Sequence, residues 1–157
     1  MINSSSQKLV SKSTLFDGLS EVQISEIIKI AEDVSFNAGQ SIMEEGDENQ
    51  DIYILVEGKV SIEKKAGAWV TVKIAISQQI GMMLGEMALI DNKPRSATVR
   101  AETPVRLVSL GREKLEKFFE GNPEAMATIA LNIARTLSNR LRHSNEMITD
   151  YLTHHAT

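Results

Sequence analysis

The middle of the chain, residues 34–110, is built from short runs rich in β-branched residues that are separated by single glycines. Glycine adopts positive φ angles at little cost, so glycines at this spacing mark tight corners between short strands. We expect about seven or eight strands here, at the spacing of a β-sandwich or barrel. The glycines that mark the corners are Gly39, Gly46, Gly58, Gly67, Gly81 and Gly85.

Alternation of apolar and polar residues predicts where the individual strands lie. Residues 52–56 and 59–63 flank a single Glu-Gly pair and have the pattern of a hairpin. Another strand is expected at 69–74, and later strands at 96–100 and 104–110. The expected fold class is α+β but mainly β: a jelly-roll β-barrel (a double-stranded β-helix) with helices before and after it.

Helical periodicity precedes the β region. Apolar residues recur at helical spacing between Leu19 and Ile30, and Ser20 with Gln23 forms a capping box at the start of this helix. The segment just before it predicts a short turn that is packed by Phe16.

Two further helices are expected after the β region. Residues 112–119 predict a short helix, and Asn122-Pro123 predicts the cap and first turn of a long helix that runs for roughly 28 residues to about Tyr151. The long helix carries an apolar seam that the β-roll or a second chain has to cover. The seam consists of Ile133, Leu137, Leu141, Ser144, Ile148 and Tyr151.

These elements predict one domain, without internal repeats or low-complexity linkers. The domain is expected to span residues 15–151, with the β-roll at about 33–110 and the C-terminal helices at about 112–151. Residues 1–14 and 152–157 are expected to be flexible, because both ends are largely polar.

Composition narrows the classes of function. The 157 residues are 42% hydrophobic and 24% charged, which is typical of one globular domain. Cysteine is absent, so disulfides, thiolate metal sites and cysteine nucleophiles are excluded. A formal net charge of −4 argues against general nucleic-acid binding. The sequence contains neither a signal-peptide pattern nor a membrane-spanning run, and we expect a cytoplasmic protein.

The segment 84–101 carries the chemistry. Its first part, 85–88, begins a short helix whose free N–H groups favour an anion, and its second part, 94–97, leads into a strand. Arg95 supplies a planar fork of donors that suits a phosphate. Glu86 lies beside this anion site as an acceptor for a sugar hydroxyl. A phosphate grip and a hydroxyl acceptor in one segment predict a nucleotide ligand.

With these residues in place, the chain resembles the cyclic nucleotide-binding domain family, which includes catabolite-activator-type regulators, cyclic-nucleotide-dependent kinases and gated channels. The resemblance covers roughly residues 15–151 and is most specific in the phosphate-binding cassette, residues 84–89 and 94–99. The glycine pattern at 37–39, 45–47 and 56–60 supports it. Leu84 stands where the family commonly has phenylalanine, an exchange of one apolar residue for another.

The resemblance implies a role for each cassette residue. Glu86 would accept a hydrogen bond from the ribose 2′-hydroxyl, and Arg95 would pair with the exocyclic oxygens of a cyclic phosphate. Backbone N–H groups of Ala88 and of Ser96 or Ala97 would complete the phosphate cradle. Gly85 would allow close approach, and the Ser96 hydroxyl could add one contact. The expected ligand-binding set is Gly85, Glu86, Met87, Ala88, Arg95, Ser96 and Ala97. The alternative is that Glu86 and Arg95 form a salt bridge that only holds a loop.

Contacts to the base are expected from the long helix. The resemblance points to Arg140 and Leu141, and Arg140 could stack on or hydrogen-bond the purine. The alternative for Arg140 is a solvated helix charge. In the family, threonine at the position of Ser96 is associated with guanine, so we expect cAMP and leave cGMP open.

No metal is expected as a cofactor. An acidic run at residues 44–51 lacks the glycine that a calcium-binding EF-hand loop needs at its sixth position, where Ile52 stands after Asp47. A solvated hairpin tip is the preferred interpretation. Metal-binding cupins place histidines inside the barrel, whereas the histidines here lie outside the β region. They are His143, His154 and His155.

The expected function is a cyclic nucleotide sensor that relays binding through its C-terminal helix to a partner, with a homodimer through that helix as the first expectation. The alternative is a degenerate module of the same fold that serves dimerisation or docking. An enzyme is not expected. In the regulator branch a helix-turn-helix domain follows the long helix, whereas only six residues follow Tyr151 here, so we expect either a stand-alone ligand sensor or a fragment of something longer. Residues 111–157 carry six basic and six acidic residues. DNA binding by this chain alone is therefore not expected.

Overall fold

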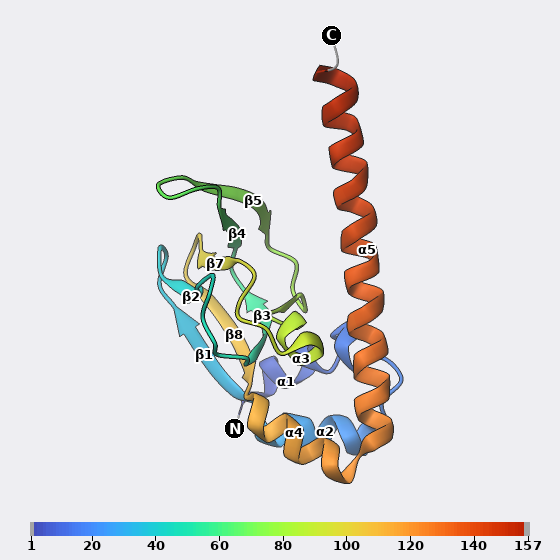
Figure 1. Cartoon of the computed structure of the whole chain (residues 1–157). Coiled ribbons are helices and arrows are strands. Elements are labelled where there is room, and N and C mark those ends of the chain that lie inside the picture. Colours follow the sequence, from blue (N-terminus) through green and yellow to red (C-terminus); the bar gives the residue numbers. More distant parts are fainter. Residues whose placement is uncertain (1, 156–157) are drawn as a thin grey trace.

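Two four-stranded antiparallel sheets face each other and form the β-roll of the molecule (Figure 1). The computed structural model describes residues 2–155. One sheet has the strand order β1-β8-β3-β6 and the other β2-β7-β4-β5. This arrangement confirms the predicted jelly-roll. Within the described residues the strands are β1 (Glu32–Phe36), β2 (Ser41–Met43), β3 (Ile52–Glu57), β4 (Val60–Lys65), β5 (Thr71–Ser77), β6 (Met83–Leu84), β7 (Thr98–Ala101) and β8 (Val105–Leu110).

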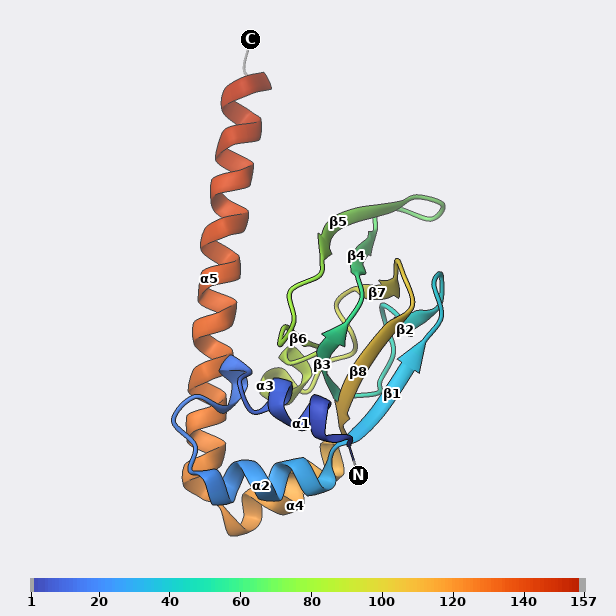
Figure 2. The same cartoon turned by 180° about the vertical axis from the view of Figure 1, so that it is seen from behind.

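Helices cover one end of the β-roll and one of its sides. Both ribbon views place α2 and α4 next to each other beneath the roll, with α5 rising alongside it (Figures 1 and 2). The last part of α5 projects past the strands in both views. The helices of the described chain are α1 (Ser4–Val10), the 3₁₀ turn η1 (Thr14–Phe16), α2 (Glu21–Ile30), α3 (Met87–Asp91), α4 (Arg112–Gly121) and α5 (Pro123–His155).

Strand β3 separates the two apolar clusters of the core. Ile52 and Ile54 pack with side chains from the helices, while Leu55 packs into the space between the sheets. All three side chains are fully buried. A strand buried on both faces needs apolar residues on both faces, which explains the run Ile52-Tyr53-Ile54-Leu55-Val56.

The predicted hairpin between residues 52–56 and 59–63 is wrong. Strand β3 pairs with β6 and β8, whereas β4 pairs with β5 and β7 in the other sheet. Gly58 makes the corner between the sheets with φ of 96°. A Cβ at this position would lie 2.4 Å from the carbonyl oxygen of Pro104. The glycine therefore permits a close crossing of two chain segments in addition to a turn.

The two ends of the chain are more ordered than the sequence indicated. Residues 4–10 form α1 instead of a flexible leader, with Asn3 accepting a hydrogen bond from the Ser6 N–H as its cap and Val10 fully buried. At the other end α5 continues to His155, beyond the expected end near Tyr151. Residues 156–157, which were included in the expected flexible tail, lie outside the described residues.

Of the two predicted helix caps, the one at the start of α2 is present and the one at the start of α5 is not. The capping box of α2 is present, with Ser20 and Gln23 bonded to each other's backbone N–H groups. The Asn122 side-chain oxygen accepts no hydrogen bond from the first turn of α5 among the described residues, and its amide donates to the Phe118 carbonyl at the end of α4.

Asn132 ties the first half of α5 to the N-terminal turn. Its side chain is buried, and the amide donates to the carbonyl of Leu15 at 3.0 Å and to that of Asp17 at 2.8 Å. This half of α5 is therefore anchored to the domain through polar as well as apolar contacts.

Replacing Gly58 with alanine should cost more stability than replacing Gly39, although both residues have positive φ. A Cβ at Gly39 meets no atom within 4 Å, so Gly39→Ala should cost only about 1 kcal/mol from its backbone conformation. Gly58→Ala adds a clash with backbone and should cost about 3 kcal/mol. Urea unfolding of both variants measures the difference, and equal losses would show that the crossing at Gly58 is not tight.

Candidate ligand-binding site

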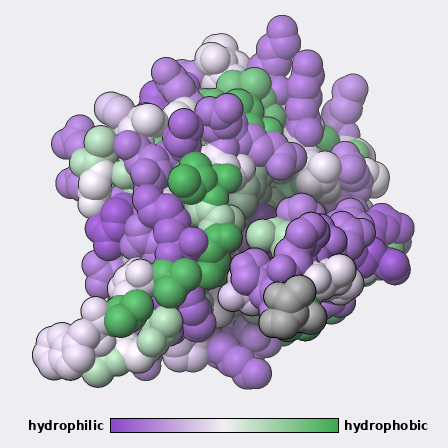
Figure 3. All heavy atoms as spheres, turned by 90° about the horizontal axis from the view of Figure 1, so that it is seen from above, coloured by the Kyte–Doolittle hydropathy of each residue, from purple (hydrophilic) through white to green (hydrophobic). Residues whose placement is uncertain are grey.

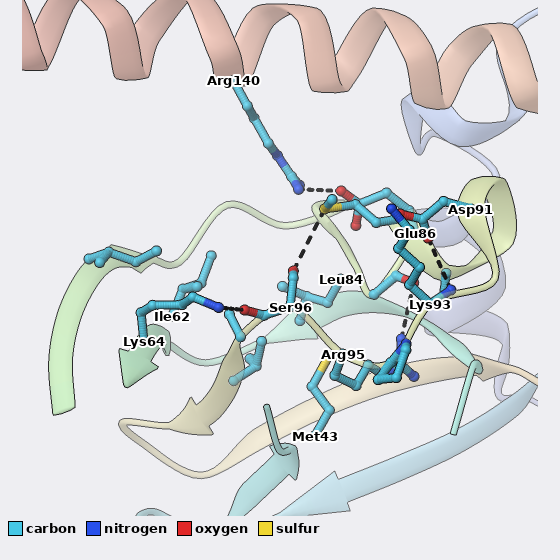
Figure 4. A pocket seen from close by; sticks show the side chains of 17 residues that line it. Met43, Ile62, Lys64, Leu84, Glu86, Asp91, Lys93, Arg95, Ser96 and Arg140 are labelled. Atoms are coloured by element: carbon cyan, nitrogen blue, oxygen red, sulfur yellow. Dashed lines mark hydrogen bonds and ion pairs between the residues drawn. The ribbon is translucent and has the colours of Figure 1, made fainter. Parts of the chain in front are cut away.

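A cavity of about 560 Å³ lies between the second sheet, the segment from Leu84 to Val99 and the middle of α5 (Figure 4). Apolar side chains form much of its wall, among them Met43, Ile62 and Ile74. The whole predicted ligand-binding set lines this one cavity: Gly85, Glu86, Met87, Ala88, Arg95, Ser96 and Ala97.

Arg95 is the most constrained side chain of the cavity. It is only 5% exposed, and its guanidinium donates to the Gly85 carbonyl, to Asn49 Oδ1 and to the Asp51 carbonyl, at 3.1, 3.1 and 2.6 Å. Its Nε is buried without a hydrogen-bond partner among the described residues. Burial lowers the pKa of the guanidinium, and nearby Tyr53 and Asp51 oppose this shift. An arginine remains charged at neutral pH. The buried Nε–H of Arg95 is therefore a cationic donor that needs an acceptor.

Gly85 makes the packing of Arg95 possible. Its φ is 78°, and a Cβ at this position would lie 2.2 Å from Arg95 Nη1. A larger residue would displace the guanidinium from the Gly85 carbonyl. Gly85 therefore leaves space for the Arg95 guanidinium and also permits the turn into α3.

Glu86 is buried and pairs with α5. Its side chain is 2% exposed, and Figure 4 shows Arg140 reaching from α5 to its carboxylate. Arg140 also donates to the Met83 carbonyl at 2.9 Å. Burial raises the pKa of Glu86, and the charge of Arg140 acts against that rise. The expected alternative of a Glu86–Arg95 salt bridge is not what the described residues form, because the carboxylate pairs with Arg140 instead.

The second half of the cassette is held from strand β4. Lys64 donates from Nζ to the Ser96 carbonyl and to Glu45 Oε1, the latter at 2.7 Å. The Ser96 hydroxyl lies 3.8 Å from the sulfur of Met87. Lys64 therefore ties the second half of the cassette to the sheet, and the contact of Ser96 with Met87 links the two halves.

Several residues that shape the site were not predicted from the sequence. Asn49 and Asp51 belong to the acidic run that was interpreted as a solvated loop, yet they hold Arg95. Asp51 also accepts a hydrogen bond from the Arg112 N–H at the start of α4. Arg112 in turn donates to the Ala88 carbonyl of α3 at 2.6 Å. These partners lie far from the cassette in sequence, so no local pattern reveals them.

One predicted base contact is not brought to the cavity. Arg140 lines it, but Leu141 does not, and the Leu141 side chain is 62% exposed. A contact from Leu141 to a base therefore stays a prediction. Among residues 2–155, no group of three or more His, Asp or Glu side chains is placed to hold a metal ion. Nor does any helix in that range have the length and apolar character needed to cross a membrane.

Comparison with known proteins identifies the family. Residues 33–122 match the model of the cyclic nucleotide-binding domain, and the chain belongs to that family. The CRP-like cAMP-activated global transcriptional regulator of Mycobacterium tuberculosis is 28% identical over 145 residues, which cover 92% of this chain and 62% of the relative. A cyclic nucleotide-binding domain from Methylobacillus flagellatus superposes with a TM-score of 0.80 at 23% identity, covering 94% of this chain and 82% of that one. The catabolite activator protein of Thermus thermophilus superposes with a TM-score of 0.71 at 27% identity, covering 90% and 63%.

Family membership confirms the resemblance drawn from the cassette and the expectation of a binding domain instead of an enzyme. The chain spans about 62% of the length of the M. tuberculosis relative.

Removing the Arg140 charge should destabilise the protein in a pH-dependent way. Because burial raises the pKa of Glu86, the ionised carboxylate is the costly form, and this cost appears as pH rises through that pKa. Arg140→Met should cost about 1–2 kcal/mol at pH 7.5, less than a fully buried pair, since the Arg140 side chain is 39% exposed. The loss should shrink at pH 5, where Glu86 can take up a proton.

Urea unfolding at the two pH values measures this difference. Arg142→Met is the matched control, because Arg142 lies on the same helix with an exposed side chain. A loss for Arg140→Met that is the same at both pH values would contradict the role assigned to the pair.

Proposed function

We propose that this chain is a sensor that binds a cyclic nucleotide, cAMP in preference to cGMP, in the cavity formed by the cassette and α5. The observation that carries the proposal is the buried Nε of Arg95, a cationic donor without a partner among the described residues. Such a donor is costly unless an acceptor satisfies it. A phosphate oxygen would provide that acceptor, and family membership supports a cyclic nucleotide as its source.

Each cassette residue would bind a different part of the ligand. Arg95 would hold the exocyclic phosphate oxygens, because a guanidinium forms short, charge-assisted hydrogen bonds to phosphate. Glu86 would accept the ribose 2′-hydroxyl. Backbone N–H groups of Ala88 and Ala97 would complete the phosphate cradle, and the apolar wall with Met43 and Ile62 would receive the less polar parts of the nucleoside.

The preference for cAMP rests on two observations. Serine at position 96, where threonine would be associated with guanine, favours adenine. The M. tuberculosis relative is described as cAMP-activated. Arg140 can stack on the purine or stay with Glu86, and each arrangement keeps α5 next to the bound nucleotide.

Signalling would use α5 as the moving element. Asn132 anchors its first half, whereas Arg140 joins its middle to Glu86. A ribose hydroxyl at Glu86 would change the partner of the carboxylate, and the purine would offer α5 a new surface. Ligand binding would thereby shift the population of α5 positions.

The second half of α5 is the proposed contact to a second copy of this chain. The seam residues Leu141, Ile148 and Tyr151 are 62%, 56% and 63% exposed, whereas Ile133 is fully buried by the protein's own core. In Figure 3, which views the molecule from above, the exposed apolar band lies on the side of β5 and does not follow α5. Seam residues spaced by three and four suit a two-fold helix pair.

The alternative function is a dimerisation or docking module that binds no nucleotide. The observation that favours it is the ion pair of Glu86 with Arg140, which already satisfies the carboxylate that a ribose hydroxyl would need.

Calorimetric titration with cAMP and cGMP separates these two functions. We expect saturable heat with cAMP and weaker binding of cGMP. Arg95→Ala should weaken cAMP binding by at least about tenfold, the loss of one charge-assisted hydrogen bond to phosphate. Arg142→Ala should bind normally, and circular dichroism should show that both variants are folded. No heat with either nucleotide well above micromolar concentration would rule out the sensor.

Light scattering tests the helix pair. The wild-type chain should have the mass of a dimer, and Leu141→Glu combined with Ile148→Glu should convert it to a monomer, because two charges would be buried in the seam. Leu131→Glu is the matched control, since Leu131 is 51% exposed on α5 but lies outside the seam. A wild-type monomer with and without nucleotide would contradict the proposed pair.

A further inference from the structure

Lys64 lines the cavity, yet its ammonium group is engaged with protein groups. Nζ donates to Glu45 Oε1 and to the Ser96 carbonyl, and Figure 4 shows the latter contact at the edge of the cassette. An ammonium group has three donors, and two of them are used here. Its charge is balanced locally by Glu45.

The Lys64 side chain, which is 48% exposed, pairs with Glu45. The second carboxylate oxygen of Glu45 accepts a hydrogen bond from the Lys65 N–H at 2.9 Å, and the Glu45 N–H donates to Thr98 Oγ1 at 3.0 Å. The Lys64 ammonium and the Lys65 N–H lower the pKa of Glu45, so the carboxylate stays ionised at neutral pH. The ammonium is thereby directed at one backbone carbonyl of the cassette.

That carbonyl belongs to the same peptide group as the Ala97 N–H. The described chain has no cis peptide bonds, and in a planar trans peptide the C=O and N–H point in opposite directions. Fixing the Ser96 carbonyl toward Lys64 therefore fixes the Ala97 N–H away from it. Ala97 lines the cavity, and its N–H has no acceptor among residues 2–155. A charged donor on the carbonyl also polarises the peptide and strengthens its N–H as a donor.

We propose that Lys64 is a positioning residue for the phosphate end of the ligand, acting by orienting and polarising the Ala97 N–H. The proposal rests on the proposed cyclic nucleotide function and adds a residue outside the cassette to it. Lys64 does not touch the nucleotide. It makes the cassette amide a better and more directional phosphate donor.

The test compares Lys64→Met with Lys64→Arg and Lys93→Met. Lys93 is a suitable control because it also lines the cavity, and its side chain has no hydrogen bond or ion pair among the described residues. The hydrogen bond from Lys64 to the Ser96 carbonyl is tested without nucleotide. The Ala97 amide resonance in a ¹⁵N–¹H spectrum should shift upfield in Lys64→Met, and much less in the other two variants. An unmoved Ala97 resonance would overturn the proposal.

Binding provides the second measurement. Lys64→Met should weaken cAMP binding by about tenfold, while Lys64→Arg and Lys93→Met stay within about threefold of the wild-type protein. The two phosphorothioate diastereomers of cAMP differ in which exocyclic oxygen is replaced by sulfur. An oriented amide distinguishes these positions, so Lys64→Met should also reduce the ratio of their affinities.

If Lys64→Met and Lys93→Met weakened cAMP binding equally and left the ratio of diastereomer affinities unchanged, Lys64 would act only through its positive charge. That result would overturn the proposal. If the wild-type chain bound neither nucleotide, the proposed function would fail separately. The Ala97 resonance would still decide whether Lys64 orients this amide.

Discussion

The site depends on the burial of one guanidinium. Arg95 joins its own loop to the Gly85 carbonyl and to the loop before β3 through Asn49 and Asp51. Gly85 is required for this because any Cβ would occupy the position of Nη1. Three of the five guanidinium N–H groups are committed to the protein, which fixes the orientation of the guanidinium, and the buried Nε has no partner among the described residues. Preorganisation of this kind reduces the cost of ordering the site when an anion binds.

A second constraint links the site to α5. The helix is held at Asn132 by two backbone carbonyls of the N-terminal turn and at Arg140 by Glu86 and the Met83 carbonyl. Beyond Arg140 its side chains are exposed to the end of the described chain. Any change at Glu86 therefore acts on the helix at its last fixed point. The proposed sensor uses this arrangement, because a small shift there moves a long, unsupported segment.

The sequence predicted features whose causes are local. Patterns of a few neighbouring residues predicted the capping box at Ser20, the short strands separated by glycines, and the cassette residues. The pairing of β3 was mispredicted, because alternation shows that a strand forms without showing its partner. The ion pair of Arg140 with Glu86 spans 54 residues, and the contact of Lys64 with Ser96 spans 32. Such contacts depend on the sheet register and the path of α5, which no short pattern specifies. The first helix was missed because its buried face is supplied by few residues, with Val10 as the main one.

We propose that the Arg95 Nε–H, which has no partner among the described residues, donates to the phosphate of a cyclic nucleotide. The most direct measurement is the Arg95 Nε–H resonance in a ¹⁵N–¹H spectrum during titration with cAMP, assigned by its loss in Arg95→Lys. We expect a downfield proton shift that saturates with one nucleotide per chain, because the donor gains a charged acceptor. An Nε–H resonance that stays in place while cAMP saturates the protein would show that Nε does not bind the phosphate.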